Sequence, residues 1–109
     1  MKVASAQIQA GICGFSTSVR AEGDDDFTVR FAVTSDCEKV RAFAAELDVV
    51  STLDELGRGH EGTILSLGRQ HTKGCCAACV VPPGIFKAMQ VAGGVALAAD
   101  VAIGLHLEE

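Results

Sequence analysis

Cysteine is the residue type in this chain most able to do chemistry, and three of the five, Cys75, Cys76 and Cys79, fall within five positions. Thiolates this close together bind a metal, exchange electrons or sulfur, or pack as small apolar groups. Cys76 and Cys79 form a C-x-x-C pair, whose spacing lets both sulfurs reach one metal ion, or each other, from a single turn of chain. A zinc ribbon has two such pairs, whereas this chain has one pair and two single cysteines, Cys13 and Cys37.

The composition predicts a soluble protein in which these thiols stay reduced. The first residues lack the long apolar core of a signal peptide. The longest apolar stretch, Val91 to Ala99, is too short and too broken by glycine to span a bilayer. We therefore expect a cytoplasmic protein with no membrane partner, where a cysteine cluster is metal-binding or catalytic rather than a disulfide framework. The net charge of −5 and the absence of any basic run argue against nucleic-acid binding.

At 109 residues, 49% of them apolar, the chain has the size and composition of a single domain, residues 1–109. Its clearest pattern is a β-hairpin. Apolar and polar residues alternate from Phe15 to Glu22 and again from Phe27 to Thr34, on either side of Gly23–Asp26. This period of two predicts two strands that bury their odd-numbered residues. The three aspartates of the turn fit a solvated hairpin tip better than a calcium loop, because the residues after them supply no further oxygen ligands.

The remaining elements surround this hairpin. A capping-box pattern, Ser35 with Glu38 three residues later, predicts the start of a first helix. Paired prolines then precede a second long helix, which is apolar almost all round and so belongs either in the core or at a subunit interface. The other expected elements are short: strands at 3–9, 49–50 and 101–107, a brief helix at 51–56, a loop at 57–62 and an ambiguous segment at 63–67, with the long apolar helix at 85–97. This order predicts an α+β fold, a two-layer sandwich with helices packed on one face of a mainly antiparallel sheet.

Hairpin geometry predicts where Cys13 lies. Paired residues of two antiparallel strands have numbers that sum to a constant, and loop-length rules limit that sum to about 48 or 50 here. Cys13 then falls opposite Ser35 or Cys37, provided that no bulge occurs at Gly14. Cys37 would lie in the first helical turn, where free amides and the helix dipole favour a thiolate and a lowered pKa. Cys37 could equally be a small residue tucked under the start of the helix.

The other candidate residues carry weaker signals. Cys75 is expected to point away from its neighbours, and His60, His71 and His106 are expected on loops or on a polar strand face. No Ser/His/Asp arrangement, phosphate-binding glycine loop or paired carboxylates appear, so no catalytic residue is assigned.

Three stretches resemble a family of small, functionally uncharacterised proteins from anaerobic bacteria and archaea. They are Gly11-Ile12-Cys13-Gly14-Phe15-Ser16-Thr17, Ser35-Asp36-Cys37-Glu38-Lys39-Val40, and Cys79-Val80-Val81-Pro82 leading into residues 84–97. The resemblance implies that His often stands at the position of Cys76 and Pro at that of Val80. A His-for-Cys exchange is tolerated at a soft-metal ligand and is poorly explained by core packing. The resemblance implies no activity.

These observations lead to three hypotheses of different kinds. In the first, Cys13, Cys37, Cys76 and Cys79 converge on one site and bind zinc or an iron–sulfur cluster. In the second, Cys37 or one of the C-x-x-C thiols carries a persulfide or cycles through a disulfide. In the third, the protein is a non-catalytic interaction module, the cysteines are filler, and the apolar helix 85–97 forms a homodimer. Such a dimer is compatible with the first two hypotheses as well.

Overall fold

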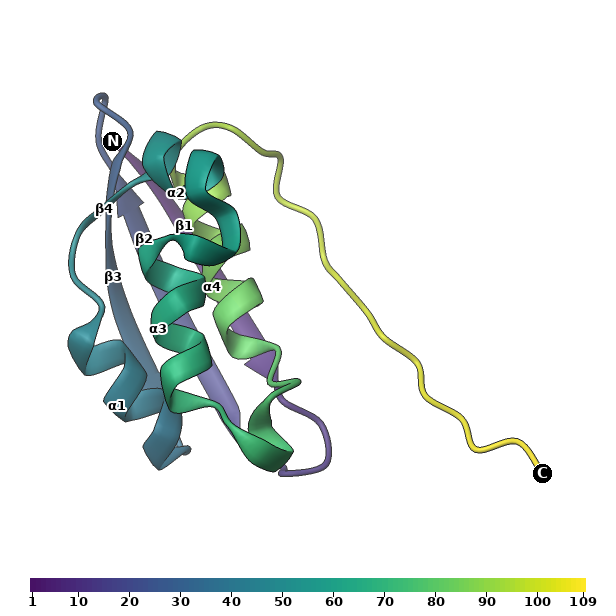
Figure 1. The fold of residues 1–109 in the computed structure, drawn as a ribbon. Coiled ribbons are helices and arrows are strands. Elements are labelled where there is room, and N and C mark those ends of the chain that lie inside the picture. Colours follow the sequence, from purple (N-terminus) through teal and green to yellow (C-terminus); the bar gives the residue numbers. More distant parts are fainter.

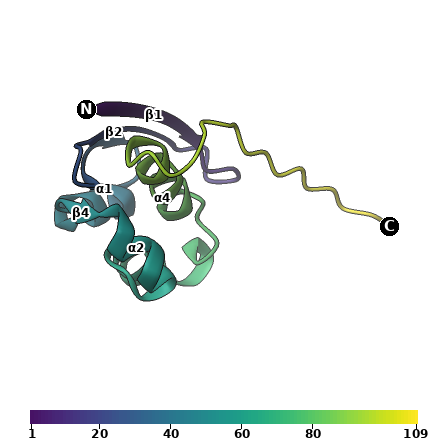
Figure 2. The same ribbon diagram turned by 90° about the horizontal axis from the view of Figure 1, so that it is seen from above.

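An antiparallel sheet forms one layer of the molecule, and all the helices cover one of its faces (Figure 1, Figure 2). The computed structural model describes residues 1–109. The strands lie in sequence order: β1 (Lys2–Gln9), β2 (Ser16–Gly23), β3 (Thr28–Ser35) and the short β4 (Val50–Ser51). The helices are α1 (Glu38–Glu46), α2 (Thr52–Arg58), α3 (Thr63–His71) and α4 (Val81–Ala92), with one-turn 3-10 helices η1 (Gly59–Glu61) and η2 (Gly74–Cys76). The predicted α+β class is confirmed.

The β2–β3 hairpin buries its odd-numbered face as expected, with Val19 and Val29 almost fully enclosed. Its predicted register is wrong, because Val19 pairs with Val33 and the sum of paired numbers is therefore 52. The cause lies in the turn. The Asp24 carboxylate accepts hydrogen bonds from the amides of Asp26 and Thr28, at 2.9 and 3.0 Å. Phe27 adopts a left-handed φ of 63°, so it belongs to the turn and not to the strand.

The core lies between the sheet and α4, which packs against β1, β2 and α3. This helix runs from Val81 to Ala92 and not over 85–97 as predicted. It starts earlier because Pro82 and Pro83 occupy its first turn, where a missing N–H costs no hydrogen bond. It ends earlier because Gly94 has a left-handed φ of 79° directly after the terminal Gly93.

The interior position of α4 bears on two expectations. Its apolar stripe, which includes Ile85 and Met89, is already covered by the chain's own sheet and α3, so the homodimer through 85–97 stays a prediction.

The stretch Gly74–Ala92 has the length and hydropathy of a membrane span by composition alone, with a mean hydropathy of 1.4. It is interrupted between η2 and α4, and α4 is placed as the central helix of a globular protein is.

Helix starts differ from the sequence pattern in two places. Helix α1 begins at Glu38, and Cys37 is its N-cap, so the Ser35 capping box is wrong. The Ser35 hydroxyl instead accepts from the Cys37 amide, at 3.1 Å, and thereby orients the chain just before the helix. The ambiguous segment after Gly62 is helix α3. The brief helix expected at 51–56 is α2, and the hydroxyl of its N-cap, Ser51, accepts a hydrogen bond from the Asp54 amide.

The predicted closing strand at 101–107 does not join the sheet. Residues 93–96 turn back on the end of α4, and residues 97–109 then leave the body as an extended segment (Figure 1). Alternating apolar residues favour an extended backbone, but a strand forms only when its amides and carbonyls find a partner, and these residues find none within the chain.

Candidate metal centre

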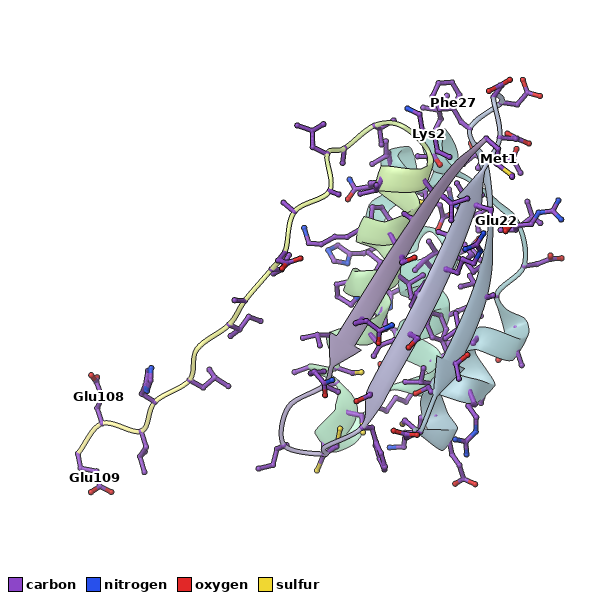
Figure 3. The ribbon with its side chains drawn as sticks, turned by 180° about the vertical axis from the view of Figure 1, so that it is seen from behind. Met1, Lys2, Glu22, Phe27, Glu108 and Glu109 are labelled. Atoms are coloured by element: carbon purple, nitrogen blue, oxygen red, sulfur yellow. The ribbon has the colours of Figure 1, made fainter.

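The four predicted ligand residues come from three segments that meet at one end of the sheet. Cys13 lies in the β1–β2 loop, Cys37 caps α1, and Cys76 and Cys79 lie between η2 and α4. Yellow sulfur atoms gather at this end in Figure 3. Two contacts tie the segments together. The Lys39 ammonium lies 3.3 Å from the Cys76 sulfur, and the Asp36 amide donates to the Ser16 carbonyl at 3.2 Å.

The pKa of the Cys79 thiol depends on its burial and on the other cysteines near it. Burial is the largest cause of its raised pKa, and repulsion from the thiolates of Cys37, Cys76 and Cys13 raises the pKa further. A hydrogen bond from the backbone of Val81 acts in the opposite direction. Since these repulsions fade with distance and solvent, Cys37, Cys76 and Cys13 lie at the same end of the molecule as Cys79.

Cys76 and Cys79 owe their closeness to a local turn, as their spacing predicts. The Cys79 amide donates to the Cys76 carbonyl at 3.0 Å, which folds the C-x-x-C segment into one turn of chain. Cys79 and Cys37 are half-buried and pack against the hydrophobic core, while Cys76 is half-buried beside Lys39. Cys75 is exposed and does not contribute to the pKa of Cys79.

Cys13 reaches this region by a different route from the predicted one. Strand β2 begins at Ser16, so Cys13 is not on the hairpin ladder and does not lie opposite Ser35 or Cys37 in a strand pair. It lies in a turn closed by a 2.9 Å bond from the Gly14 amide to the Gly11 carbonyl, and both glycines have left-handed φ values, of 74° and 92°. Cys13 is exposed.

The thiols share a neighbourhood without forming a closed coordination site. All five cysteines are free, and no three His, Cys, Asp or Glu side chains are arranged to hold a metal ion. With Zn–S bonds of about 2.3 Å, tetrahedral geometry places the sulfurs of one site about 3.8 Å apart, in direct van der Waals contact. The donor set suits a soft metal, and no other part of the chain packs against the two glycines beside Cys13, since a Cβ at Gly11 or Gly14 would meet no atom within 4 Å.

Positive charge surrounds this cluster. Cys37 caps α1, and Cys79 accepts from the backbone of Val81, the first residue of α4, so two helix N-termini point their partial positive charge at the thiols. Lys39 adds a full charge. Sequence reasoning missed Lys39. Its signal was its place two residues after Cys37 in the first turn of the helix.

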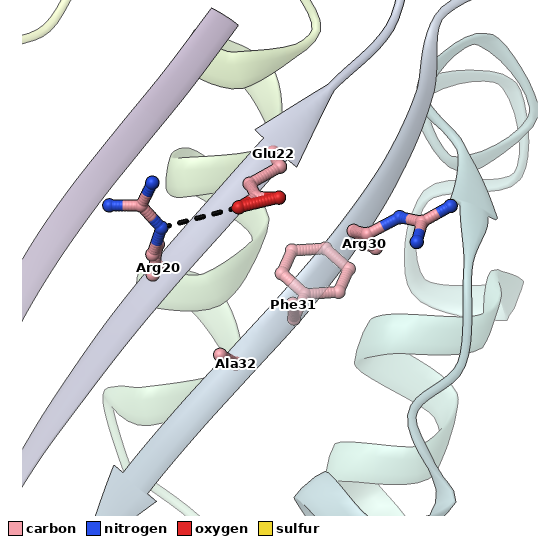
Figure 4. A pocket seen from close by; sticks show the side chains of 5 residues that line it. All are labelled: Arg20, Glu22, Arg30, Phe31 and Ala32. Carbon is pink, nitrogen blue, oxygen red and sulfur yellow. Dashed lines mark hydrogen bonds and ion pairs between the residues drawn. The ribbon is translucent and has the colours of Figure 1, made fainter.

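The histidines lie elsewhere. His71 contacts the carboxylate of Glu46 and packs near the ring of Phe43, and His60 is exposed on η1. His106 is exposed in the extended C-terminal segment. The polar face of the sheet carries a separate shallow hollow, lined by Arg20, Glu22, Arg30, Phe31 and Ala32 (Figure 4). The Arg20–Glu22 ion pair spans 3.3 Å there, and no cysteine lines the hollow.

The model of one protein family matches residues 4–105 of the chain. The chain belongs to this family of unknown function, DUF6951. No curated protein and no solved structure matches the chain. The matched region includes all the cysteines and most of the extended C-terminal segment. Membership agrees with the resemblance to an uncharacterised family.

Proposed function

We propose that the protein binds zinc or an iron–sulfur cluster through Cys13, Cys37, Cys76 and Cys79. One observation carries the proposal: the three segments that bear Cys13, Cys37 and the C-x-x-C pair meet at one end of the sheet, where Lys39 contacts Cys76 and the Asp36 amide donates to the Ser16 carbonyl. Chance burial explains one half-buried cysteine, but it does not explain why three separate segments bring their cysteines to the same end of the sheet. Four thiolates in one place repel one another, and a metal cation removes that repulsion by replacing their protons.

The surroundings support metal binding in a second way. A four-thiolate centre carries excess negative charge, which needs nearby donors and positive charge to be stable. Lys39 beside Cys76 and the Val81 amide beside Cys79 provide both, and Cys37 lies at the N-terminus of α1. The glycine-flanked turn would let Cys13 move toward the other sulfurs as the metal enters.

Metal analysis and absorption spectra test the proposal. The full chain is purified anaerobically, assayed for zinc, iron and labile sulfide, and then titrated with Co²⁺ after removal of its metal. We expect one metal centre per chain, a thiolate-to-cobalt absorption band, and proton release on binding. An iron–sulfur centre gives coloured protein, and a zinc centre gives colourless protein.

Serine variants identify the ligands. Cys37→Ser, Cys76→Ser and Cys79→Ser should lose the centre, and Cys13→Ser should weaken it. Cys75→Ser is the matched control, because Cys75 is a neighbouring exposed cysteine outside the cluster, and it should bind as the wild type does. Metal-free protein in which all five thiols titrate freely and Co²⁺ gives no thiolate band refutes the proposal.

The Lys39–Cys76 contact favours one alternative, a thiol exchange module. The Cys76 thiolate would attack a disulfide of a partner and release one partner thiolate. Cys79 would then attack the mixed disulfide, release the second partner thiol and leave a Cys76–Cys79 disulfide. In this case Cys76 is the fastest thiol to alkylate in metal-free protein, and Lys39→Met slows it. Uniformly slow alkylation, unchanged by Lys39→Met, excludes this alternative.

A further inference from the structure

The C-terminal segment, residues 97–109, is extended and has no partner. Val101, Ile103, Leu105 and Leu107 are 63 to 87% exposed, and they alternate with Ala102, Gly104, His106 and Glu108. In Figure 1 and Figure 3 the segment runs away from its own sheet. The family model extends through residue 105, so the segment is part of the domain that the family shares. Exposed apolar side chains at this density on an extended chain are typical of a segment that binds a partner surface.

Strand β1 offers an open edge of about the same length. It pairs on one side with β2 and lies at the end of the strand order, so its other side is free. The Ala10 amide donates to the Phe15 carbonyl, which continues the β1–β2 ladder by one pair. Because antiparallel pairs alternate, the even-numbered residues of β1 face β2, and the amides and carbonyls of Val3, Ser5, Gln7 and Gln9 point outward.

The helix layer beside this edge is incompletely covered. A Cβ at Gly84 of α4 would touch the Ile8 side chain, so this stripe of the helix flanks β1. Val91 is seven residues further along, on the same stripe. Both Ile8 and Val91 are only partly buried. An added strand would place its odd-numbered apolar side chains over them and its small and polar residues on the wet face of the sheet.

We propose that the C-terminal strand of each copy adds to the β1 edge of a second copy, giving a two-fold, strand-exchanged dimer with a five-stranded sheet in each half. The chain holds both parts of the interaction, a free strand of seven residues (101–107) and a free edge of eight (2–9). A second copy satisfies both at once, as a two-fold interface requires, whereas another protein would satisfy one and leave the other exposed. The chain leaves α4 beside Lys2 and then departs from its own edge, which leaves that edge open to the partner.

Light scattering after size exclusion tests the dimer, with reductant and chelator present so that neither disulfides nor metal contribute. The full chain should elute at twice its mass of 11.3 kDa. The double variant Ile103→Lys/Leu105→Lys should weaken the dimer at least about a hundredfold, since each tail loses two buried side chains. Ala102→Lys/His106→Lys adds the same two lysines on the opposite side of the strand and should keep the dimer.

A mixing experiment isolates the strand-to-edge contact. Ser5→Pro removes an outward-pointing amide of β1 without breaking the β2 ladder, so it should block the edge. The Ser5→Pro variant keeps an intact C-terminal strand, and the Ile103→Lys/Leu105→Lys variant keeps an intact β1 edge. When the two are mixed, the strand of the first can therefore pair with the edge of the second. The mixture should therefore form a heterodimer tighter than either variant forms alone. Circular dichroism confirms that each variant is folded. A monomeric wild type overturns the proposal, as does a dimer that the tail lysines leave unchanged.

Discussion

Glu55 gives the sharpest prediction about what holds the helix layer together. Its side chain is 2% exposed, and its two carboxylate oxygens accept the amides of Thr63 and Ile64 at 3.0 and 2.8 Å. These are free donors of the first turn of α3, whose N-cap, Gly62, has no side chain to satisfy them. Glu55 therefore caps α3 from another helix.

Glu55→Gln keeps the shape but changes the donors and acceptors. One oxygen remains, and the new amide nitrogen faces an N–H group that it cannot accept from. A hydrogen bond to a charged group contributes about 1.5–3 kcal/mol, and the charge at the helix N-terminus adds about 0.3–1 kcal/mol. We expect a loss of about 2–4 kcal/mol, a large part of the 5–15 kcal/mol typical of a domain. The melting temperature should fall by about 10 °C or more.

Urea unfolding followed by circular dichroism measures this change. Glu61→Gln is the matched control, because Glu61 is an exposed glutamate of the neighbouring η1 whose carboxylate makes no hydrogen bond or ion pair. It should shift the free energy of unfolding by less than about 0.5 kcal/mol. If the two variants lose equal stability, the cap does not contribute what its geometry implies.

Three further predictions are checked by the same unfolding assay. Gly68→Ala would place a Cβ 2.7 Å from Pro82 and should lower the free energy of unfolding by about 1–3 kcal/mol. Its control, Gly57→Ala, lies in open space on α2 and should raise the free energy of unfolding by up to about 1 kcal/mol. Equal effects of the two variants would contradict close packing of α3 on α4. Thr52→Val removes a buried hydroxyl that has no partner and should be neutral or stabilising, so a clear loss would reveal a hidden bond. The raised pKa of Cys79 means that the folded state keeps this proton longer than the unfolded state; metal-free protein should lose stability as the pH rises above about 8.5, and Cys79→Ala should flatten that decline.

Local patterns predicted most of the secondary structure because they depend on neighbouring residues. Alternation specified the hairpin and its buried face, and Ser51 specified the start of α2. Turn and helix ends were less predictable where a side chain replaced the expected backbone pattern. The Asp24 carboxylate lengthened the turn and shifted the register, and the prolines lay inside α4 and not before it.

Some features of the candidate site likewise follow from local sequence, and others depend on the tertiary structure. The sequence by itself determined the C-x-x-C turn and the position of Cys37 at a helix start, since both depend on a few consecutive residues. Only the tertiary structure decided that a glycine-flanked loop, and not a strand pair, brings Cys13 to this end of the sheet, and that Lys39 contacts Cys76. Such contacts join residues far apart in the chain, and they depend on how helices of fixed length pack on a twisted sheet. The C-terminal strand shows the same principle, because alternation favours an extended backbone while pairing depends on which edge is free.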